Sequence, residues 1–194
     1  RELAEPEHQR ARECGGSVFA EMDKLAAKIP AGSEGVLFLP YMAGERSPIW
    51  NPYAKGVFYG LDFTKTRAHF YRAAMEGVAY SLRHNLEIAA QAGAPVTQLH
   101  AMGGAANSRL WTQIKSDVTQ LPIRSAKSDM ATTLGAAMLA GVATGVYKDY
   151  AQAVRQTVRM ERSYAPNEEN SSVYERGFCD YLKLYSQLET LMHG

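Results

Sequence analysis

Two adjacent glycines, Gly103 and Gly104, open the small-residue segment GGAANS between an apolar stretch and a helix-like stretch. A phosphate or ribose that approaches a strand-to-helix turn needs free backbone N–H groups and space where a Cβ would stand. Two interpretations follow. Either the glycines clear the backbone for a ligand, or they form a tight turn with Asn107 or Ser108 as a helix cap. GxGxxG and P-loop motifs are both missing, so the spacing alone favours the turn.

A second small-residue segment, ATTLGAAMLAG at 131–141, is typical of a helix that packs closely in a core. In the alternative interpretation, Gly135 and the alanines around it clear space beside a flat ligand such as adenine.

The segment AGERSPIWNPYAKG (43–56) has turn chemistry, charge and aromatic residues. Its Arg46 is suited to bind phosphate as a bidentate donor. Equally, the segment is a surface loop whose Trp50 covers the core. Asp62, at the end of an expected strand, is either a base or, as we favour, a solvated strand-end carboxylate. The five histidines lack metal-ligand spacing, and no GxSxG motif is present.

The composition places the chain among globular proteins, since 46% of its 194 residues are hydrophobic and 21% are charged. A net charge of +1 gives no basic excess for nucleic acid or an anionic membrane. The two cysteines form no disulfide framework, which favours a reduced, cytoplasmic setting. The first residues, RELAEPEHQR, contain no initiator Met and no signal-peptide core, so we expect either a fragment or a processed chain.

The periodicity predicts elements that can position these residues. Phe19, Met22, Leu25 and Ala26 share one side of a short helix before Pro30. Apolar and alternating runs predict strands at 36–40, 57–63, 98–102 and 123–127. Helices are expected over 67–91 after a Thr66 cap, and over 108–118, 131–145, 147–158 and 171–193. This alternation predicts an α/β sheet, with Gly103-Gly104 at the carboxyl end of a strand, where ligands usually bind.

These segments together resemble the C-terminal domain of the FGGY carbohydrate kinases. Residues 56–76, GVFYGLDFTKTRAHFYRAAME, fit the second signature of that family through Gly60, Leu61, a seven-residue gap, His69-Phe70, and Ala73 to Glu76. LFLPYMAGERSPIWNPYAKG precedes the signature, and GGAANSRLW and TTLGAAMLAG follow it, in the order of the family. The resemblance covers residues 31–146 and is strongest to the family's xylulose kinases.

The resemblance implies an actin-like, ribonuclease H-like ATPase fold with C-terminal helices, in which ATP lies between two such domains. It implies that the glycine pair approaches the nucleotide, that Asn107 lies near its adenine or ribose, and that the 131–145 helix backs the pocket. The nucleotide-contacting residues expected from the resemblance are Gly103, Gly104, Ala105, Asn107, Ser108 and Gly135. Many relatives have a third glycine at the position of Ala105 and a basic residue at the position of Asn107.

The resemblance also implies what other parts of such a kinase supply. The catalytic Asp and a glycine-rich phosphate hairpin are expected upstream of Arg1, so no catalytic residue is assigned to this chain. Mg²⁺ is expected as a cofactor beside ATP, because the phosphate charges must be neutralised. The expected partners are a sugar, most similar to D-xylulose in this family, and the N-terminal domain, with a homodimer as a further possibility. Gluconate, glycerol or another sugar is an alternative substrate, and a non-catalytic actin-like module is an alternative function.

The same resemblance divides the chain into three expected regions. These are an N-terminal helical segment (1–30), a nucleotide-binding α/β core (31–146) that lacks the first β-hairpin of the family's domain, and a C-terminal helical tail (147–194). The tail can either pack on the core or pair between chains.

Overall fold

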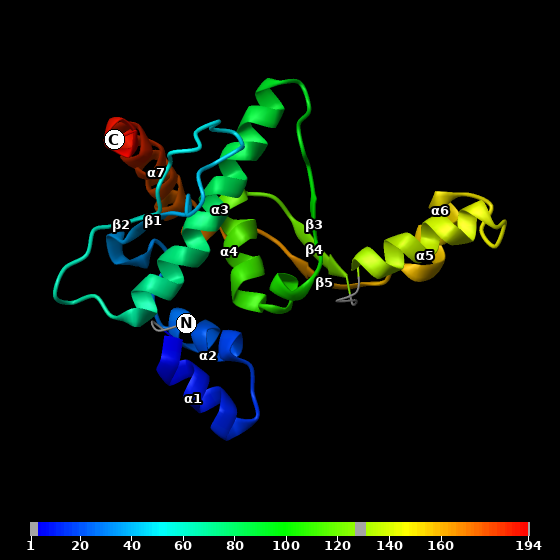
Figure 1. Ribbon diagram of the computed structural model, residues 1–194, viewed down its shortest axis with the longest axis horizontal. Helices are drawn as coiled ribbons and strands as arrows, with labels where there is room; N and C mark the ends of the chain where they lie inside the picture. Colours follow the sequence, from blue (N-terminus) through cyan, green and yellow to red (C-terminus); the bar gives the residue numbers. More distant parts are fainter. Residues whose placement is uncertain (1–3, 127–130, 194) are drawn as a thin grey trace.

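The computed structural model describes residues 4–126 and 131–193. In chain order the elements are α1 (Glu5–Cys14), α2 (Val18–Ala26), the 3-10 segment η2 (Ser33–Gly35), β1 (Leu37–Leu39), β2 (Val57–Tyr59), α3 (Arg67–Gln91), β3 (Leu99–Ala101), η3 (Gly104–Asn107), α4 (Arg109–Thr119), β4 (Ile123–Ala126), α5 (Ala131–Ala143), α6 (Tyr150–Thr157), β5 (Met160–Tyr164), η4 (Glu168–Asn170) and α7 (Ser171–Met192). Figure 1 shows α3 crossing the body of the molecule, with the α1–α2 pair below it and an α5–α6 arm extending to one side.

The long helix α3 begins and ends where the sequence predicts. Thr66 precedes it in extended conformation, and the Thr66 N–H donates to Nδ1 of His69 at 3.0 Å, as in a capping box. Because Nδ1 accepts this bond, the Nε2 of His69 carries the hydrogen that it donates to Oε2 of Glu34 at 3.1 Å. The helix ends before Gly93, which has a positive φ of 86°. His69 therefore both caps α3 and fastens the loop before β1.

The strands form two small sheets, whereas the alternation of elements predicted one. β1 and β2 pair antiparallel, with Leu37 opposite Tyr59. In the other sheet, β3 lies parallel to β4, and β5 pairs antiparallel with β4. The sequence analysis missed β5 because its MERSY sequence is short and charged, although its side chains alternate between more and less buried positions.

The strand predicted over 57–63 is longer than the observed one. The observed strand β2 ends at Tyr59, because Gly60 adopts a φ of 83°, which lies outside the β region. Beyond it, Oδ1 of Asp62 accepts hydrogen bonds from the N–H and Oγ1 of Thr64 at 2.7 and 2.6 Å. These bonds hold the pKa of the exposed Asp62 carboxyl below its usual value. Asp62 is thus the solvated turn carboxylate that the sequence favoured, and lies outside the strand.

The core is rich in tyrosine and is built by α7 as much as by the strands. One face of α7 buries aromatic side chains against β1, the start of the following loop, and α3: Tyr174, Phe178, Tyr181 and Tyr185 meet Leu39, Tyr41 and Tyr80. The hydroxyls of Tyr41 and Tyr181 share a hydrogen bond of 2.5 Å, and burial raises the pKa of Tyr181 to about 12. Of the two alternatives for the C-terminal helix, packing on the core is therefore correct for this chain.

A buried carboxylate joins three parts of this core. Glu76, in the middle of α3, accepts hydrogen bonds from the N–H of Gly32 at 3.0 Å and from Oγ of Ser33 at 2.7 Å. It also accepts from Nε of Arg72 at 2.7 Å and from the hydroxyl of Tyr174 at 3.1 Å. The side chains of Glu76 and Arg72 are only 2% and 8% exposed. Burial of the two opposite charges is possible because each satisfies the other.

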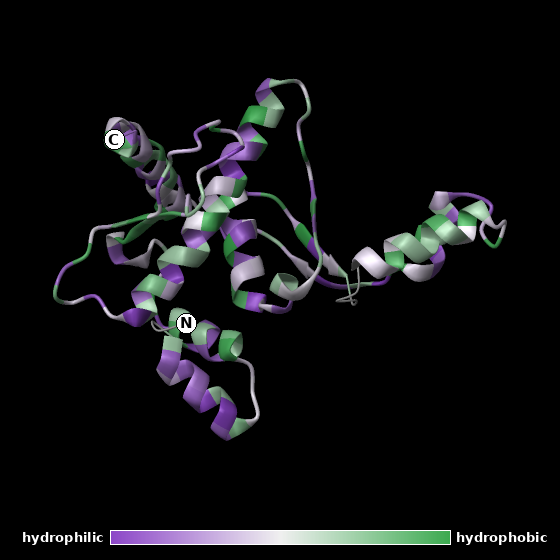
Figure 2. Cartoon of the chain, in the orientation of Figure 1, coloured by the Kyte–Doolittle hydropathy of each residue, from purple (hydrophilic) through white to green (hydrophobic). Residues whose placement is uncertain are grey.

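The α5–α6 hairpin extends away from the body (Figures 1 and 2). Its two helices pack on one another, and Gly141 gives room for the ring of Tyr147. Figure 2 shows hydrophobic residues along the arm, and four of them are strongly exposed: Leu139, Val146, Tyr150 and Val154. The sequence favoured a core helix here, and that expectation is wrong for α5 as the structure places it, whereas the expectation of a pocket wall stays a prediction. No helix among the described residues is long and apolar enough to cross a membrane.

Replacing Glu76 with Gln should lower the free energy of unfolding by about 3–5 kcal/mol, because Arg72 would keep a buried charge without its counterion. The measurement is urea unfolding followed by circular dichroism. Glu87, paired with Arg83 on the same helix and 42% exposed, is the matched control. Its change to Gln should cost about 0–1 kcal/mol, and equal costs at the two positions would contradict the role given to Glu76.

Candidate functional site

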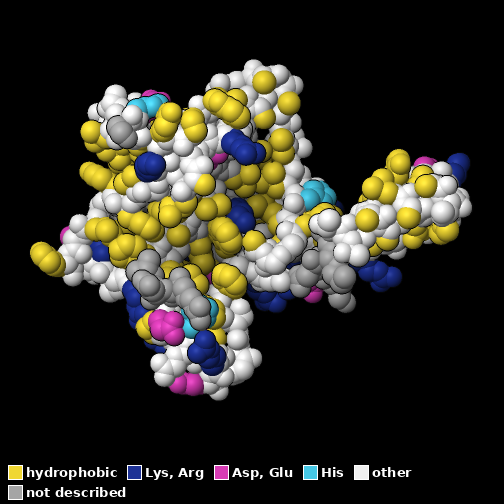
Figure 3. Space-filling view, viewed as in Figure 1, with side chains coloured by type: hydrophobic (Ala, Val, Ile, Leu, Met, Phe, Trp, Pro, Cys, Tyr) yellow, Lys and Arg dark blue, Asp and Glu magenta, His cyan; other side chains and the backbone are white. Residues whose placement is uncertain are grey.

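A cavity of about 780 Å³ lies between α2, α3 and the turn that contains the predicted glycines. Four of the six residues expected to contact a nucleotide line it together: Gly104, Ala105, Asn107 and Ser108. The cavity is mostly apolar and partly enclosed, with a size within the usual range for small-molecule sites. Figure 3 shows hydrophobic side chains gathered on the face between the α1–α2 pair and the body of the molecule.

The two glycines of the pair have different roles. Gly103 has φ 80° and ψ −177°, a conformation that is open only to glycine, and it turns the chain after β3. Gly104 begins η3 on the cavity wall, and a Cβ built on it would meet no atom within 4 Å. Gly103 is therefore needed for the turn itself, whereas Gly104 leaves space in the cavity. The turn interpretation therefore holds for Gly103, and the ligand interpretation stays a prediction for Gly104.

Ser108 caps α4, as the turn interpretation expected. Its Oγ accepts the N–H of Trp111 at 3.0 Å, and its carbonyl accepts the hydroxyl of Thr112 at 2.8 Å. Asn107 is exposed at the end of η3 and contributes an amide to the lining. The helix N-terminus and the amide give this edge of the cavity its hydrogen-bonding chemistry.

Aromatic side chains form much of the remaining wall. Phe19 of α2 is 75% exposed, so it is not the core residue that helical spacing predicted. Trp111 of α4 is held by its Nε1, which donates to the carbonyl of Met75 at 3.0 Å. Tyr71 is held by its hydroxyl, which donates to Glu7 at 2.9 Å. Flat, fixed surfaces of this kind suit an aromatic base.

The ammonium group of Lys115 packs on the ring of Trp111 in this wall. Nζ of Lys115 lies 4.0 Å from the centre of the Trp111 ring, and burial lowers the pKa of Lys115. Among the described residues of the lining, Asp23 of α2 is the one carboxylate and no histidine occurs. The described residues contain no group of three or more His, Cys, Asp or Glu side chains that could hold a metal ion, so none of them is assigned to Mg²⁺.

Other predicted residues lie elsewhere. Gly135 is on α5, outside the cavity lining, with open space around it. The loop that carries Arg46 lies near the end of α7, on the far side of the body from the α1–α2 pair (Figure 1). Trp50 is 81% exposed there and does not cover the core. Asn51 anchors that loop instead, donating to the hydroxyl of Tyr185 at 2.9 Å and accepting the N–H of Tyr53 at 2.9 Å.

The sequence analysis missed the aromatic wall. Phe38 alternates with core residues along β1, and Tyr71 and Trp111 occupy helical core-like spacings. Nothing in such spacing distinguishes a side chain that fills the core from one that faces a cavity beside it.

The model of the FGGY family of carbohydrate kinases, C-terminal domain, matches residues 2–144 of this chain. A xylulose kinase of Staphylococcus epidermidis is 35% identical over 173 residues, which cover 89% of this chain and 35% of that protein. A gluconokinase of Bacillus subtilis is 34% identical over 189 residues, which cover 97% of this chain and 37% of that protein. The chain thus spans little more than a third of the length of these relatives.

Solved structures show the same relationship. The crystal structure of xylulose kinase from Rhodospirillum rubrum superposes with a TM-score of 0.83 at 33% identity, covering 99% of this chain and 38% of that one. A glycerol kinase from Plasmodium falciparum, solved with ADP, has a TM-score of 0.71 over 84% of this chain and 33% of that one. At 23% identity, this second likeness shows the fold alone.

Replacing Gly77 with Ala should lower the free energy of unfolding by about 1–3 kcal/mol, because the new methyl would press on the carbonyl of Phe38 where α3 crosses β1. Gly135 is the matched helical control, since its Cβ would meet open space. Its change to Ala should leave stability equal or raise it by up to about 1 kcal/mol through helix propensity. Urea unfolding of both variants measures the difference. A loss of stability in G135A would mean that α5 packs on the body.

Proposed function

This chain belongs to the FGGY family of carbohydrate kinases, and from that membership we propose that it forms the nucleotide-holding side of an ATP-dependent sugar kinase. The predicted α/β fold, of the actin-like ATPase type with C-terminal helices, is confirmed by the family match and by the superposition on a xylulose kinase. The kinase transfers the γ-phosphoryl group of ATP to a hydroxyl of its sugar substrate.

The observation that carries this proposal is the shared cavity of Gly104, Ala105, Asn107 and Ser108. The apolar wall suits the adenine ring, and the Asn107 amide and the cap of α4 suit its polar edge or the ribose. The missing Cβ of Gly104 lets the nucleotide approach the backbone. For Gly103 we propose the role of shaping this turn. The nucleotide contact expected for Gly135 stays a prediction.

D-xylulose is the substrate that we propose, with D-xylulose 5-phosphate as the product. Its support is the xylulose kinases among the relatives at 35% and 33% identity. Gluconate is the principal alternative, because a gluconokinase is nearly as similar and covers more of the chain. Purified full-length enzyme assayed on a panel of D-xylulose, gluconate and glycerol separates these substrates.

The proton-transfer chemistry is assigned to another part of such a kinase. Phosphoryl transfer needs a carboxylate positioned at the attacking hydroxyl. Among the described residues, the cavity lining contains one carboxylate, Asp23 of α2. We therefore propose that a further domain supplies the catalytic Asp and the sugar pocket, and that this domain is the main partner of the chain. We place the protein in the cytoplasm, supported by two exposed cysteines that form no disulfide.

Replacing Gly104 with Leu should weaken ADP binding at least about tenfold, since a Cβ at this position meets no protein atom and the longer side chain would occupy space in the cavity. Isothermal titration calorimetry measures the affinity, and circular dichroism checks the fold. Ala90→Leu is the control, because Ala90 is exposed on α3 and outside the lining. Equal affinity of G104L and the unaltered chain would remove the cavity from the nucleotide site.

The purified 194 residues should not phosphorylate D-xylulose, because no residue of this chain is assigned as the catalytic base. A coupled ADP-release assay with ATP, Mg²⁺ and D-xylulose measures this. Turnover by the purified chain above that of a G104L sample would show that the reaction needs no further domain.

A further inference from the structure

The chain makes an unusual left-handed turn just before β1. Four consecutive residues have positive φ: Gly32 at 82°, Ser33 at 49°, Glu34 at 50° and Gly35 at 88°. Two of them carry side chains, and a residue with a Cβ pays about 1–2 kcal/mol for this conformation. Such strain persists only where surrounding contacts impose it, and it concentrates at functional sites.

Side chains from α3 and from Lys65, just before it, hold this turn in place. Glu76 accepts the N–H of Gly32 and the hydroxyl of Ser33, whose side chain is buried. His69 donates to the carboxylate of Glu34, and Nζ of Lys65 lies 3.4 Å from the same oxygen. The turn is therefore fixed at both of its non-glycine residues, and its shape is built into the fold.

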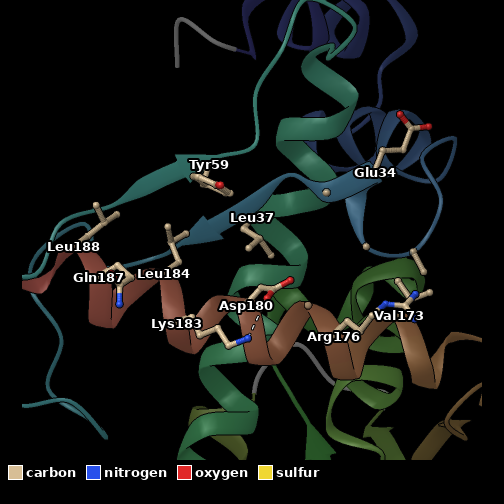
Figure 4. Close-up of a pocket in the computed structure, with 14 residues that line it drawn as sticks. Glu34, Leu37, Tyr59, Val173, Arg176, Asp180, Lys183, Leu184, Gln187 and Leu188 are labelled. Carbon is tan, nitrogen blue, oxygen red and sulfur yellow. Dashed lines mark ion pairs between the residues drawn. The ribbon is translucent and has the colours of Figure 1, made fainter.

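A second cavity of about 780 Å³ opens directly beside this turn (Figure 4). The turn and β1–β2 form one side, and the exposed edge of α7 forms the other. The apolar part of the lining is Leu37, Tyr59, Val173, Leu184 and Leu188. It shares no residue with the cavity beside Gly104, because successive side chains of β1 point to opposite faces.

The polar side chains of this cavity leave positive charge available. Arg176 of α7 has no carboxylate within ion-pair distance among the described residues. Lys183 lies farther along α7. Among the described residues its one ion-pair partner is Asp180, with 4.0 Å between Nζ and Oδ1, and the Lys183 side chain is 76% exposed. Figure 4 shows Glu34 pointing away from α7, and its Oε2 already contacts Nζ of Lys65 and Nε2 of His69.

We propose that this cavity between the left-handed turn and α7 is a second ligand site, which binds a small organic anion with an apolar body. The anionic group, a phosphate or a carboxylate, lies at Arg176, where a guanidinium can donate two hydrogen bonds. The apolar body packs on Leu37, Leu184 and Leu188. Asp180 lies between the two cations and repels a second anionic group, so the site selects a ligand with one anionic group over a ligand with two.

The ligand site is independent of the nucleotide proposal, since the two cavities have separate linings. The volume of this cavity suits a small metabolite. Because the turn is already held in place, little conformational entropy should be lost when a ligand binds.

The test is a titration of the ¹⁵N-labelled chain with phenyl phosphate, with phenol as the neutral probe of the same ring. Phenyl phosphate should cause saturable shifts in the amide signals of Gly32, Gly35, Arg176 and Gly177, and phenol should bind more weakly. Arg176→Gln should weaken phenyl phosphate about tenfold, through the loss of a charge-assisted contact. Arg155→Gln, an exposed arginine of α6, should leave the affinity unchanged.

The site would be overturned by the absence of saturation up to about 10 mM probe, by equal affinities of R176Q and R155Q, or by equal affinities of phenol and phenyl phosphate. Shifts confined to residues 104–108 would also overturn it, by placing the anion in the other cavity. A parallel titration with ADP keeps the two proposals apart, because ADP should shift residues 104–108 whether or not phenyl phosphate binds beside α7.

Discussion

A single buried carboxylate fixes how the segments of this chain meet. Glu76 lies in the middle of α3 and accepts hydrogen bonds from the turn before β1, from Arg72 one helical turn earlier, and from Tyr174 of α7. A buried charge is stable only when its lone pairs are satisfied, so the turn and α7 cannot shift without leaving it unpaired. The position of β1 against α3 follows from this junction, and so do the two cavities beside β1.

The strand β1 separates the two cavities although it is only three residues long. Leu37 faces α7 and the cavity beside the left-handed turn, and Phe38 faces the cavity beside Gly104. Behind it, Gly77 lets the backbone of α3 approach the carbonyl of Phe38 closely. The family signature runs from Gly60 to Glu76, and its residues have structural roles in this chain. Gly60 ends a strand, His69 caps a helix, and Glu76 joins three segments.

The sequence predicted most clearly the features that depend on local chemistry. Thr66 and Gly93 mark the ends of α3, and Ser108 marks the start of α4, because caps and left-handed glycines act within a few residues. The features that it missed depend on contacts between distant segments. Phe19 has the spacing of a core residue but faces a cavity, and α5 has the composition of a core helix but lies in an exposed arm. Periodicity states which side chains share a face, and only the fold states what that face meets.

The even similarity of this chain to a xylulose kinase and to a gluconokinase has a physical explanation in the site. The cavity beside Gly104 offers apolar rings, an amide and a capped helix start, which are groups that bind a base or a ribose and have no sugar-specific pattern. Under the proposed function this chain holds ATP, which kinases for different sugars share as a substrate, so its sequence has no reason to diverge with the sugar. Identities of 35% and 34% to the two enzymes are what such a part should have. Under the proposed function, the residues that distinguish a ketose from a sugar acid belong to the part of the kinase that holds the attacking hydroxyl.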